Sequence, residues 1–351
     1  MDVTLPESVA PERVETDRLT TNVLVSGDPD GTPICLVHGN VSSSRFWAEL
    51  MAETPDEYRV VAPDLRGYGD SETKPVDATR GVRDFTEDLA ALFDELGFET
   101  VALVGWSIGG GIAMQYAIDH PGTLTELVLV STMSPYGFGG TTRDGTPCQP
   151  DYAGTGGGLA NDEFVERLAD GDTTAAADAS PRSVMQAFYV GPDHEFDPET
   201  ADVYVEAMCA TAVGDGNYPG DAVPSENWPG VAPGEHGVLN AISPKYFDAS
   251  GLTDVDPKPP VLWVRGDADR IVSDGSFFDA GFLGRIGELP GWPGEDVYPP
   301  QPMNDQTRDV LEAYAADGGR YTEETFADVG HSPHVERPEQ FRSVLLDFLR
   351  S

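Results

Sequence analysis

Lysine is almost absent from this chain of 351 residues, occurring only at Lys74, Lys245 and Lys258. Lysine and arginine together number 21 against 61 aspartates and glutamates, which gives a formal net charge of −40 at pH 7. A surface with this much negative charge repels the phosphates of nucleic acids and of anionic membranes. We therefore expect neither a nucleic acid nor a membrane as a partner.

The excess of acidic residues is spread along the whole chain rather than gathered in a tail. Self-repulsion at this charge destabilises a compact state in dilute salt. At molar salt the Debye length falls to about 3 Å and most of the repulsion is screened. The composition therefore favours a protein adapted to a salt-rich cytoplasm, as in halophilic organisms, over an ordinary acidic surface.

Long apolar runs and clusters of metal-binding residues are also missing. The longest apolar runs are far too short to span a bilayer. Residues 1–13 lack the pattern of a secretory signal, so we expect a cytoplasmic protein. Cys35 lies in an apolar run and is expected in the core, whereas Cys148 and Cys209 would pair only in an oxidising compartment. No histidine and cysteine cluster has the spacing of a metal site.

Strand and helix patterns alternate through the first 131 residues. Short apolar runs typical of strands occur at 22–26, 34–37, 58–62, 101–104 and 127–131. Two helices are predicted between them, over 82–96 and 108–119. This alternation indicates an α/β protein with βαβ units, and therefore a mostly parallel sheet.

The pattern breaks between residues 133 and 257, which are rich in glycine, proline, aspartate and threonine. Aromatic residues within this stretch favour an ordered cap over a disordered segment. The predicted organisation is a core of residues 1–132 and 258–351 with a cap inserted at 133–257. The expected helices of the cap lie at 162–168, 182–189 and 201–210. The later elements of the core are strands at 261–264 and 323–327 and helices at 306–316 and 341–349.

The segment Gly105-Trp106-Ser107-Ile108-Gly109 has the G-x-S-x-G pattern of a nucleophilic serine. It follows the strand at 101–104 and opens the helix at 108–119, which is the strand–turn–helix setting that this pattern requires. Such a turn lifts the Ser107 hydroxyl above the sheet edge, and the helix N-terminus favours negative charge beside it. An inert serine in a glycine-rich turn is the alternative, and the setting argues against it.

Three further segments resemble the α/β-hydrolase family. His38-Gly39-Asn40 is similar to the segment that supplies an oxyanion donor, residues 64–71 to the D-x-R-G-x-G-x-S segment, and Gly330-His331 to the segment that carries the base. The resemblance covers the two predicted core segments and not the insertion. It implies an α/β-hydrolase fold, with a mostly parallel central sheet, helices on both faces and a large inserted cap.

The base must be a histidine that reaches Ser107. The resemblance favours His331, which follows the last predicted strand, over His334, for which the alternative is a surface or supporting position. A carboxylate must orient the imidazole, and the chain order serine, acid, histidine is expected. The resemblance to the family's G-x-x-D segment favours Asp269, with Asp267 capping the turn.

The resemblance also implies an oxyanion hole made by the backbone N–H groups of Asn40 and Ile108. The Asn40 side chain either adds a donor or serves the turn. His38, Asp64 and Arg66 are expected to support the loops rather than to react. Four aromatic residues are candidates for the substrate pocket, with core packing as the alternative for the tryptophans and fold analogy as the only basis for the others: Trp47, Trp106, Tyr136 and Phe138.

These residues predict a serine esterase that acts on a small molecule through an acyl-enzyme and needs no metal and no cofactor. Lactone hydrolysis, carbon–carbon bond hydrolysis and cofactor-free perhydrolysis on the same triad stay open. A binding protein that has lost catalysis is the rival from another class. Epoxide hydrolases and haloalkane dehalogenases are disfavoured because they need a carboxylate at the position of Ser107. The sequence specifies neither the substrate nor the oligomeric state.

The charge predicts that folding depends on salt. Because salt screens the repulsion between acidic residues, we expect the melting temperature to rise steeply between millimolar and molar KCl. Thermal melts followed by far-UV circular dichroism over this range test the expectation. A fully native, heat-stable protein in millimolar salt would contradict it.

Overall fold

The computed structural model describes residues 5–351. Within them, eight strands form one sheet: β1 (Ala10–Glu15), β2 (Thr20–Gly27), β3 (Thr32–Val37), β4 (Tyr58–Pro63), β5 (Val101–Trp106), β6 (Leu124–Val130), β9 (Val261–Gly266) and β10 (Tyr321–Phe326). Their order across the sheet is β1-β2-β4-β3-β5-β6-β9-β10. β2 pairs antiparallel with β1 and β4, and every pair from β4 to β10 is parallel. The predicted mostly parallel sheet is confirmed.

The sequence patterns predicted each strand of this sheet except β1. That strand reads Ala-Pro-Glu-Arg-Val-Glu, and only Val14 among its residues is buried. An edge strand exposed on both faces has no apolar alternation to reveal it. Its backbone pairing with β2, rather than its side chains, places it in the sheet.

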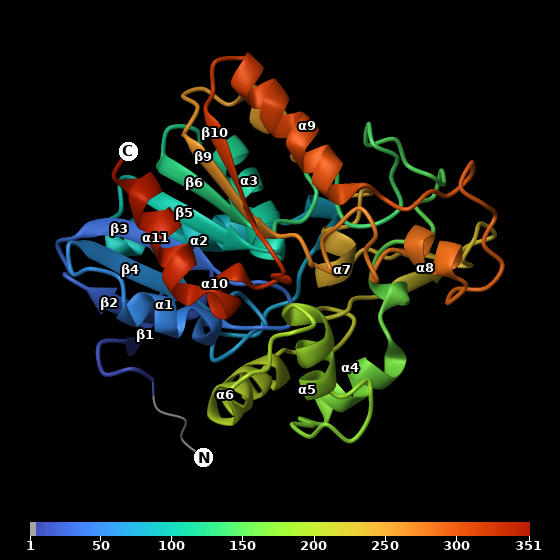
Figure 1. Ribbon diagram of the computed structural model, residues 1–351, viewed down its shortest axis with the longest axis horizontal. Coiled ribbons are helices and arrows are strands. Elements are labelled where there is room, and N and C mark those ends of the chain that lie inside the picture. The colour runs from blue at the N-terminus through green and yellow to red at the C-terminus, as the bar shows by residue number, and fades with distance from the viewer. Residues whose placement is uncertain (1–4) are drawn as a thin grey trace.

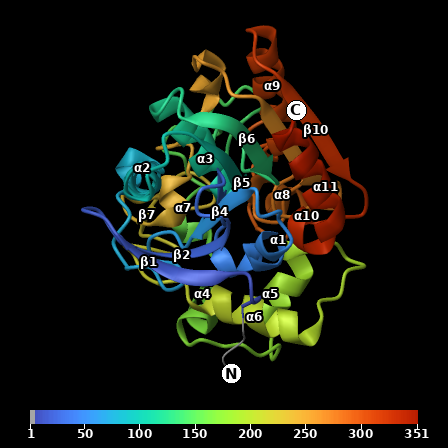
Figure 2. The ribbon, with the colours of Figure 1, turned by 90° about the vertical axis from the view of Figure 1, so that its left-hand side faces the viewer.

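Helices cover both faces of the sheet, as predicted (Figure 2). The helices of the core are α1 (Ala48–Ala52), α2 (Arg83–Leu96), α3 (Ile108–Asp119), α9 (Met303–Ala316), α10 (Pro333–Glu336) and α11 (Pro338–Leu349). Figure 2 shows α2 and α3 on one face and α1, α10 and α11 on the other. Successive residues of a strand point to opposite faces. Leu103 of β5 therefore joins the core under α2 and α3, while Val104 joins the core under α1 and α11.

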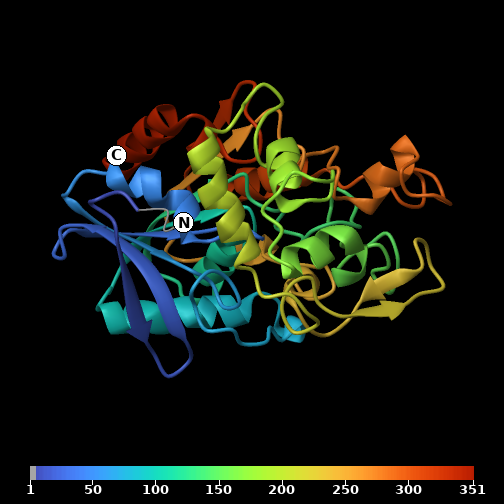
Figure 3. The same cartoon turned by 90° about the horizontal axis from the view of Figure 1, so that it is seen from below.

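Between β6 and β9 the chain leaves the sheet for a long insertion. Its elements are α4 (Asp162–Ala169), α5 (Pro181–Val184), a π-helical turn (Met185–Tyr189), α6 (Pro198–Cys209), β7 (Ala222–Pro224), β8 (Val231–Pro233) and α7 (Val238–Ala241). Much of the insertion, green to yellow in Figure 3, lies toward the end of the molecule away from the β1–β2 hairpin, and its yellow-green helix α6 lies nearer the middle. The predicted helices at 162–168 and 201–210 are confirmed. The one at 182–189 is a short α-helix continued by the π-helical turn.

A second excursion from the sheet, after β9, packs against the insertion. It contains α8 (Ala280–Ile286), which lies beside the insertion in Figure 1. The Tyr298 hydroxyl donates to the carbonyl oxygen of Ala153 at 3.0 Å, and Trp228 Nε1 donates to that of Pro290 at 2.9 Å. Chain segments on both sides of β9 thus meet at this end of the molecule, and the proposed cap boundaries at 133 and 257 stay a prediction.

The structure also bears on the apolar runs and the cysteines. In the part of the chain that the structure describes, no helix is both long and apolar enough to cross a membrane. Cys35 is buried in the core, as predicted. Cys148 and Cys209 are both free thiols.

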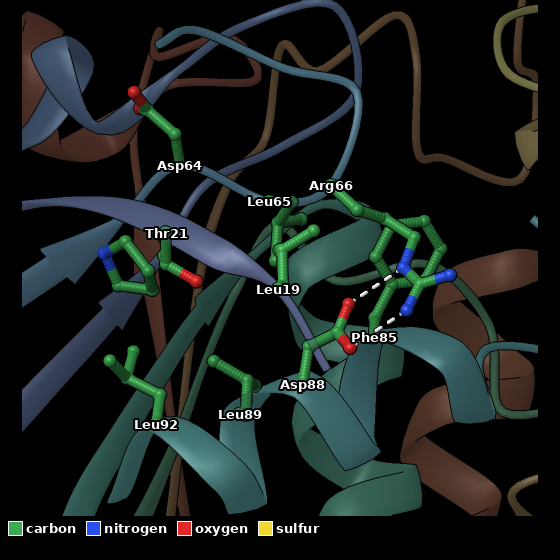
Figure 4. Close-up of a pocket in the computed structure, with 10 residues that line it drawn as sticks. Leu19, Thr21, Asp64, Leu65, Arg66, Phe85, Asp88, Leu89 and Leu92 are labelled. Atoms are coloured by element: carbon green, nitrogen blue, oxygen red, sulfur yellow. Dashed lines mark hydrogen bonds and ion pairs between the residues drawn. The ribbon is translucent and has the colours of Figure 1, made fainter. Parts of the chain in front are cut away.

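A buried ion pair fastens the loop after β4 to α2 (Figure 4). Arg66 donates from Nε and Nη2 to the two carboxylate oxygens of Asp88, at 2.6 and 2.7 Å. Their side chains are 7% and 8% exposed. The adjoining cavity measures about 10 Å³, which is room for one water. Nearby Asp64 accepts the backbone N–H groups of Ser44 and Asp70 at 2.8 and 3.0 Å. Arg66 and Asp64 therefore both support loops, as expected.

We predict that Asp88→Ala lowers the free energy of unfolding by about 3 kcal/mol, because it leaves the buried Arg66 charge without its bidentate partner. Urea unfolding at fixed KCl concentration measures the loss. Asp309→Ala, which breaks an exposed pair with Arg143, is the matched control and should change stability little. An equal loss in both variants would show that burial does not strengthen the pair.

Candidate active site

Four loops that carry predicted site residues meet at one edge of the sheet. β3, β5, β9 and β10 run parallel, so their carboxyl ends lie on the same side. Asn40 follows β3, Ser107 follows β5, Asp269 follows β9 and His331 follows β10. This is the edge at which open α/β sheets hold their ligands.

Ser107 occupies a strained turn between β5 and α3. Its φ of 59° and ψ of −118° lie in a region that residues other than glycine rarely adopt. Such a conformation persists only where the surroundings hold it. Here the Ser107 N–H donates to the carbonyl oxygen of Val130 at 2.9 Å, and the Met133 N–H donates to that of Ser107 at 3.2 Å. The segment that ends β6 thus holds the turn, and the Ser107 side chain stays partly exposed.

His331 and Asp269 form a buried pair. The distance from His331 Nδ1 to Asp269 Oδ2 is 2.8 Å, and the two side chains are 3% and 2% exposed. The other carboxylate oxygen accepts the N–H groups of Ile271 at 2.8 Å and Val272 at 3.0 Å. A carboxylate oxygen accepts from an N–H, so His331 Nδ1 is the donor of this bond and Nε2 is the ring nitrogen left for another partner.

Asp267, the other carboxylate of this loop, has a different contact. Its Oδ1 accepts the N–H of Asp328 at 2.7 Å, which ties the loop after β9 to the loop after β10. The structure therefore pairs Asp269, and not Asp267, with His331. This contact joins two loops and does not test the expectation that Asp267 caps its own turn, which stays a prediction.

Trp106 links the histidine loop to the serine turn. Its Nε1 donates to the carbonyl oxygen of His331 at 2.8 Å, and the two rings lie 5.6 Å apart. Because Trp106 directly precedes Ser107, this contact places His331 beside the Ser107 turn. The indole is 1% exposed and packs within the core on the face covered by α1 and α11.

The loop after β3 passes directly over the serine turn. A Cβ on Gly39 would lie 3.2 Å from the Cβ of Ser107, closer than most Cβ contacts, so glycine eases this close approach. The Gly39 carbonyl oxygen accepts from His38 Nδ1 at 2.7 Å and from the Ser42 hydroxyl at 2.8 Å. The C=O and N–H of a trans peptide point in opposite directions. The N–H of Asn40 therefore points away from His38 and Ser42.

His38 is a buried support of this loop. Its Nε2 accepts the backbone N–H of Leu65 at 3.0 Å, which leaves Nδ1–H to donate to Gly39. Burial lowers the pKa of His38, so the ring is neutral and can accept on one side while it donates on the other. The supporting role expected for His38 agrees with these contacts.

Two tyrosines that the sequence analysis did not assign to the site hold the Asn40 loop. The Tyr68 hydroxyl donates to Asn40 Oδ1 at 2.7 Å. The Tyr189 hydroxyl lies 3.0 Å from the carbonyl oxygens of both Asn40 and Val41. Tyr189 comes from the insertion, where only the enrichment in aromatic residues pointed toward an ordered structure.

His334 is buried against Trp47 and Trp106. Its ring stacks on Trp47 at 4.1 Å and meets Trp106 edge-on at 4.9 Å. It is 3% exposed, so it is a supporting residue and not a surface one. Among residues 5–351, neither of its ring nitrogens has a hydrogen-bond partner. Burial, together with nearby His331, lowers the pKa of His334 well below 6.5, so the ring is neutral.

The four aromatic candidates for the pocket lie in different surroundings. Trp47 and Trp106 are fully buried in the core. Tyr136 and Phe138 are partly exposed in the loop after β6, where Phe138 packs against the core under α2 and α3. Pocket lining by these residues stays a prediction. Within the described residues, no group of three or more histidine, cysteine, aspartate or glutamate side chains could hold a metal ion.

Comparisons with known proteins agree with this architecture. Residues 32–169 match the family model of the alpha/beta hydrolase fold. The crystal structure of a carboxylesterase from Bacillus subtilis superposes with a TM-score of 0.60 at 18% identity, over 98% of this chain and 93% of that chain. The chain has the fold of the α/β-hydrolase family. The α/β-hydrolase sheet, the helices on both of its faces and the inserted region are thus all present, as the sequence predicted.

Curated relatives match this chain over a shorter segment. The 2-hydroxymuconate semialdehyde hydrolase of Pseudomonas sp. (strain CF600) is 37% identical over 117 residues, which is 32% of this chain and 40% of that protein. The fluoroacetate dehalogenase of Burkholderia sp. is 35% identical over 127 residues, or 35% of this chain and 41% of that protein. The matches span 31% to 41% of the length of these and similar relatives.

We predict that His334→Phe reduces the loss of stability in acid. A histidine whose folded pKa is lowered takes up its proton only on unfolding, so stability falls as the pH drops below about 6.5, by up to about 1.4 kcal/mol per pH unit for one proton. Phenylalanine keeps the stack on Trp47 and takes up no proton. Urea unfolding between pH 5 and pH 7.5 should give a shallower slope for the variant. Equal slopes would show that folded His334 is protonated with its ordinary affinity.

Proposed function

We propose that the chain is a serine hydrolase that cleaves a carboxylic ester, or a related small carbonyl substrate, through an acyl-enzyme. The observation that carries the proposal is the strained Ser107 turn beside the buried His331–Asp269 pair. A serine is a weak nucleophile until a base removes its proton, and a carboxylate that orients the base completes such a site. The α/β-hydrolase fold supports the same interpretation.

In the proposed acylation step, the Ser107 oxygen attacks the carbonyl carbon while His331 Nε2 takes the hydroxyl proton. Asp269 stabilises the imidazolium that forms. The tetrahedral intermediate then collapses, the bond from carbon to the leaving oxygen breaks, and His331 donates its proton to the departing alcohol. Water attacks the acyl-enzyme with the same base, which releases the acid and restores Ser107.

The oxyanion of the intermediate needs donors that are in place before the reaction. Ile108 is the first residue of α3, so its N–H has no acceptor within the helix. The helix N-terminus adds favourable positive potential at the same point. The N–H of Asn40 is the second proposed donor, since the contacts of the Gly39 carbonyl direct it away from His38 and Ser42. One donor thus lies at the start of α3 and the other in the loop after β3, and both elements meet at Ser107.

Hydrolysis of a carbon–carbon bond on the same triad is the second candidate, favoured by the identity to the 2-hydroxymuconate semialdehyde hydrolase. The fluoroacetate dehalogenase is nearly as similar over a comparable length, so this identity makes carbon–carbon hydrolysis a candidate without ranking it above ester hydrolysis. Dehalogenation and epoxide opening through an alkyl-enzyme need a carboxylate as nucleophile. The serine at position 107 therefore argues against both.

We also propose that the protein works in a salt-rich cytoplasm. The support is the formal net charge of −40. Acidic residues at this density repel one another, and molar salt screens the repulsion and so permits a compact state. For this reason the activity is best measured in molar KCl.

The test is the hydrolysis of p-nitrophenyl esters of increasing acyl length, with Ser107→Ala beside the wild type. We expect turnover by the wild type and a fall in kcat of at least about 10⁴-fold in the variant. Ser26→Ala is the matched control. Ser26 lies on β2, which is separated from β5 and its serine turn by β4 and β3, and its hydroxyl donates to the carbonyl oxygen of Met51 in α1. It should keep full activity.

The negative outcomes separate the alternatives. Ester turnover that persists in Ser107→Ala would contradict the proposal of an acyl-enzyme on Ser107. A folded wild type that leaves esters intact but cleaves 2-hydroxymuconate semialdehyde would favour carbon–carbon hydrolysis. Oxidation that requires added peroxide would favour perhydrolysis. No turnover and no labelling of Ser107 by a fluorophosphonate would favour a binding protein.

A further inference from the structure

Three consecutive residues of the insertion, Tyr189, Val190 and Gly191, reach both loops of the candidate site. They lie at the end of the π-helical turn, an irregularity that is frequent at functional sites. The Tyr189 ring packs edge-on to Trp106 at 5.8 Å and to His331 at 6.4 Å. Tyr189 is 7% exposed and Val190 is 1% exposed, so the segment is packed into the molecule rather than laid over its surface.

The Tyr189 hydroxyl holds the backbone on both sides of Val41. It lies 3.0 Å from the carbonyl oxygen of Asn40, which precedes Val41, and 3.0 Å from that of Val41 itself. Val41 has a φ of 45°, a left-handed conformation that is strained for a β-branched residue. Rotation of Val41 out of this conformation would turn one of the two carbonyls away from Tyr189. The hydroxyl thus opposes the relaxation that would displace Asn40.

The same segment is tied to the histidine loop through Glu336. One carboxylate oxygen of Glu336 accepts the N–H of Gly191 at 2.8 Å, and the other accepts the N–H of Gly330 at 2.7 Å. Glu336 is 5% exposed, so both bonds are shielded from water. A Cβ on Gly330 would lie 2.5 Å from the Gly191 nitrogen, which shows that the two backbones are in direct contact. Gly330 immediately precedes His331.

We propose that residues 189–191 form a latch. Through it the insertion holds the loop after β3, which carries Asn40, and the loop after β10, which carries His331, in the geometry that the reaction needs. Tyr189 and Glu336 are its positioning residues. The inference rests on the proposed serine hydrolase function. Tyr189 acts through Asn40, and Glu336 acts through the backbone next to His331. Displacement of this one segment releases both loops together, so a complete site requires a docked insertion.

Tyr189→Phe tests the oxyanion side, because it removes the hydroxyl and keeps the ring. We expect kcat for a p-nitrophenyl ester to fall about tenfold or more while KM stays within about threefold, since a misplaced oxyanion donor costs transition-state stabilisation rather than binding. Tyr298→Phe is the matched control: it removes a hydroxyl bonded to a backbone carbonyl at 3.0 Å, away from both loops. It should keep kcat within about twofold.

Glu336→Gln tests the histidine side, because the amide keeps one acceptor and turns an NH₂ group toward the other backbone N–H. The expected result is again a fall in kcat of about tenfold with KM nearly unchanged. Asp279→Asn is its control, since the buried Asp279 carboxylate accepts the N–H groups of Phe282 and Gln301 away from the site. Unchanged kcat in both latch variants, or equal falls in the controls, overturns the latch.

Hydrogen exchange separates failure of the latch from failure of the proposed function. In Tyr189→Phe we expect amides of residues 38–44 to exchange at least about tenfold faster than in the wild type, and in Glu336→Gln those of residues 328–332. The controls should leave both segments unchanged. If the wild type neither hydrolyses esters nor reacts with a fluorophosphonate, the proposed function fails. The exchange rates of the variants relative to the wild type still show whether the latch holds the two loops. Wild-type exchange rates in both latch variants would reject it.

Discussion

The left-handed backbone at Ser107 constrains much of the surrounding structure. A serine at φ 59° needs neighbours that hold it, and the bonds to Val130 and Met133 do so from the end of β6. The loop after β3 must also cross the turn closely, which Gly39 permits. The order of β3, β5 and β6 as neighbours in the sheet is what makes these contacts available at one place.

The site is assembled from residues that are distant in the chain. Asp269 and His331 are 62 residues apart, and Trp106 reaches His331 across 225. Adjacent parallel strands need long crossover connections, yet they deliver their carboxyl ends to one edge. Hydrogen bonds between the loops, rather than within them, then set the geometry. The insertion takes part in this through Tyr189, so the site is not a property of the sheet alone.

The exposed acidic residues and the buried carboxylates affect the stability of the fold in different ways. Each of four buried or nearly buried carboxylates meets donors of its own: Asp64 and Glu336 accept backbone N–H groups, Asp88 accepts from Arg66, and Asp269 accepts from His331 and two N–H groups. Such groups are screened little by salt, whereas exposed acidic residues repel one another over a Debye length. Salt therefore acts on the surface of this protein more than on its candidate site.

The sequence by itself determined the features that depend on local pattern. Strand and helix periods predicted the parallel sheet and most of its elements, and the turn motif with the family resemblance singled out Ser107, Asp269 and His331, which the fold brings to one edge. Only the tertiary structure decided that β1 joins the sheet, that His334 is buried, and that Tyr189 and Glu336 link the insertion to the loops. These depend on contacts between segments far apart in the chain, and such contacts leave no periodicity or spacing in the residues that make them.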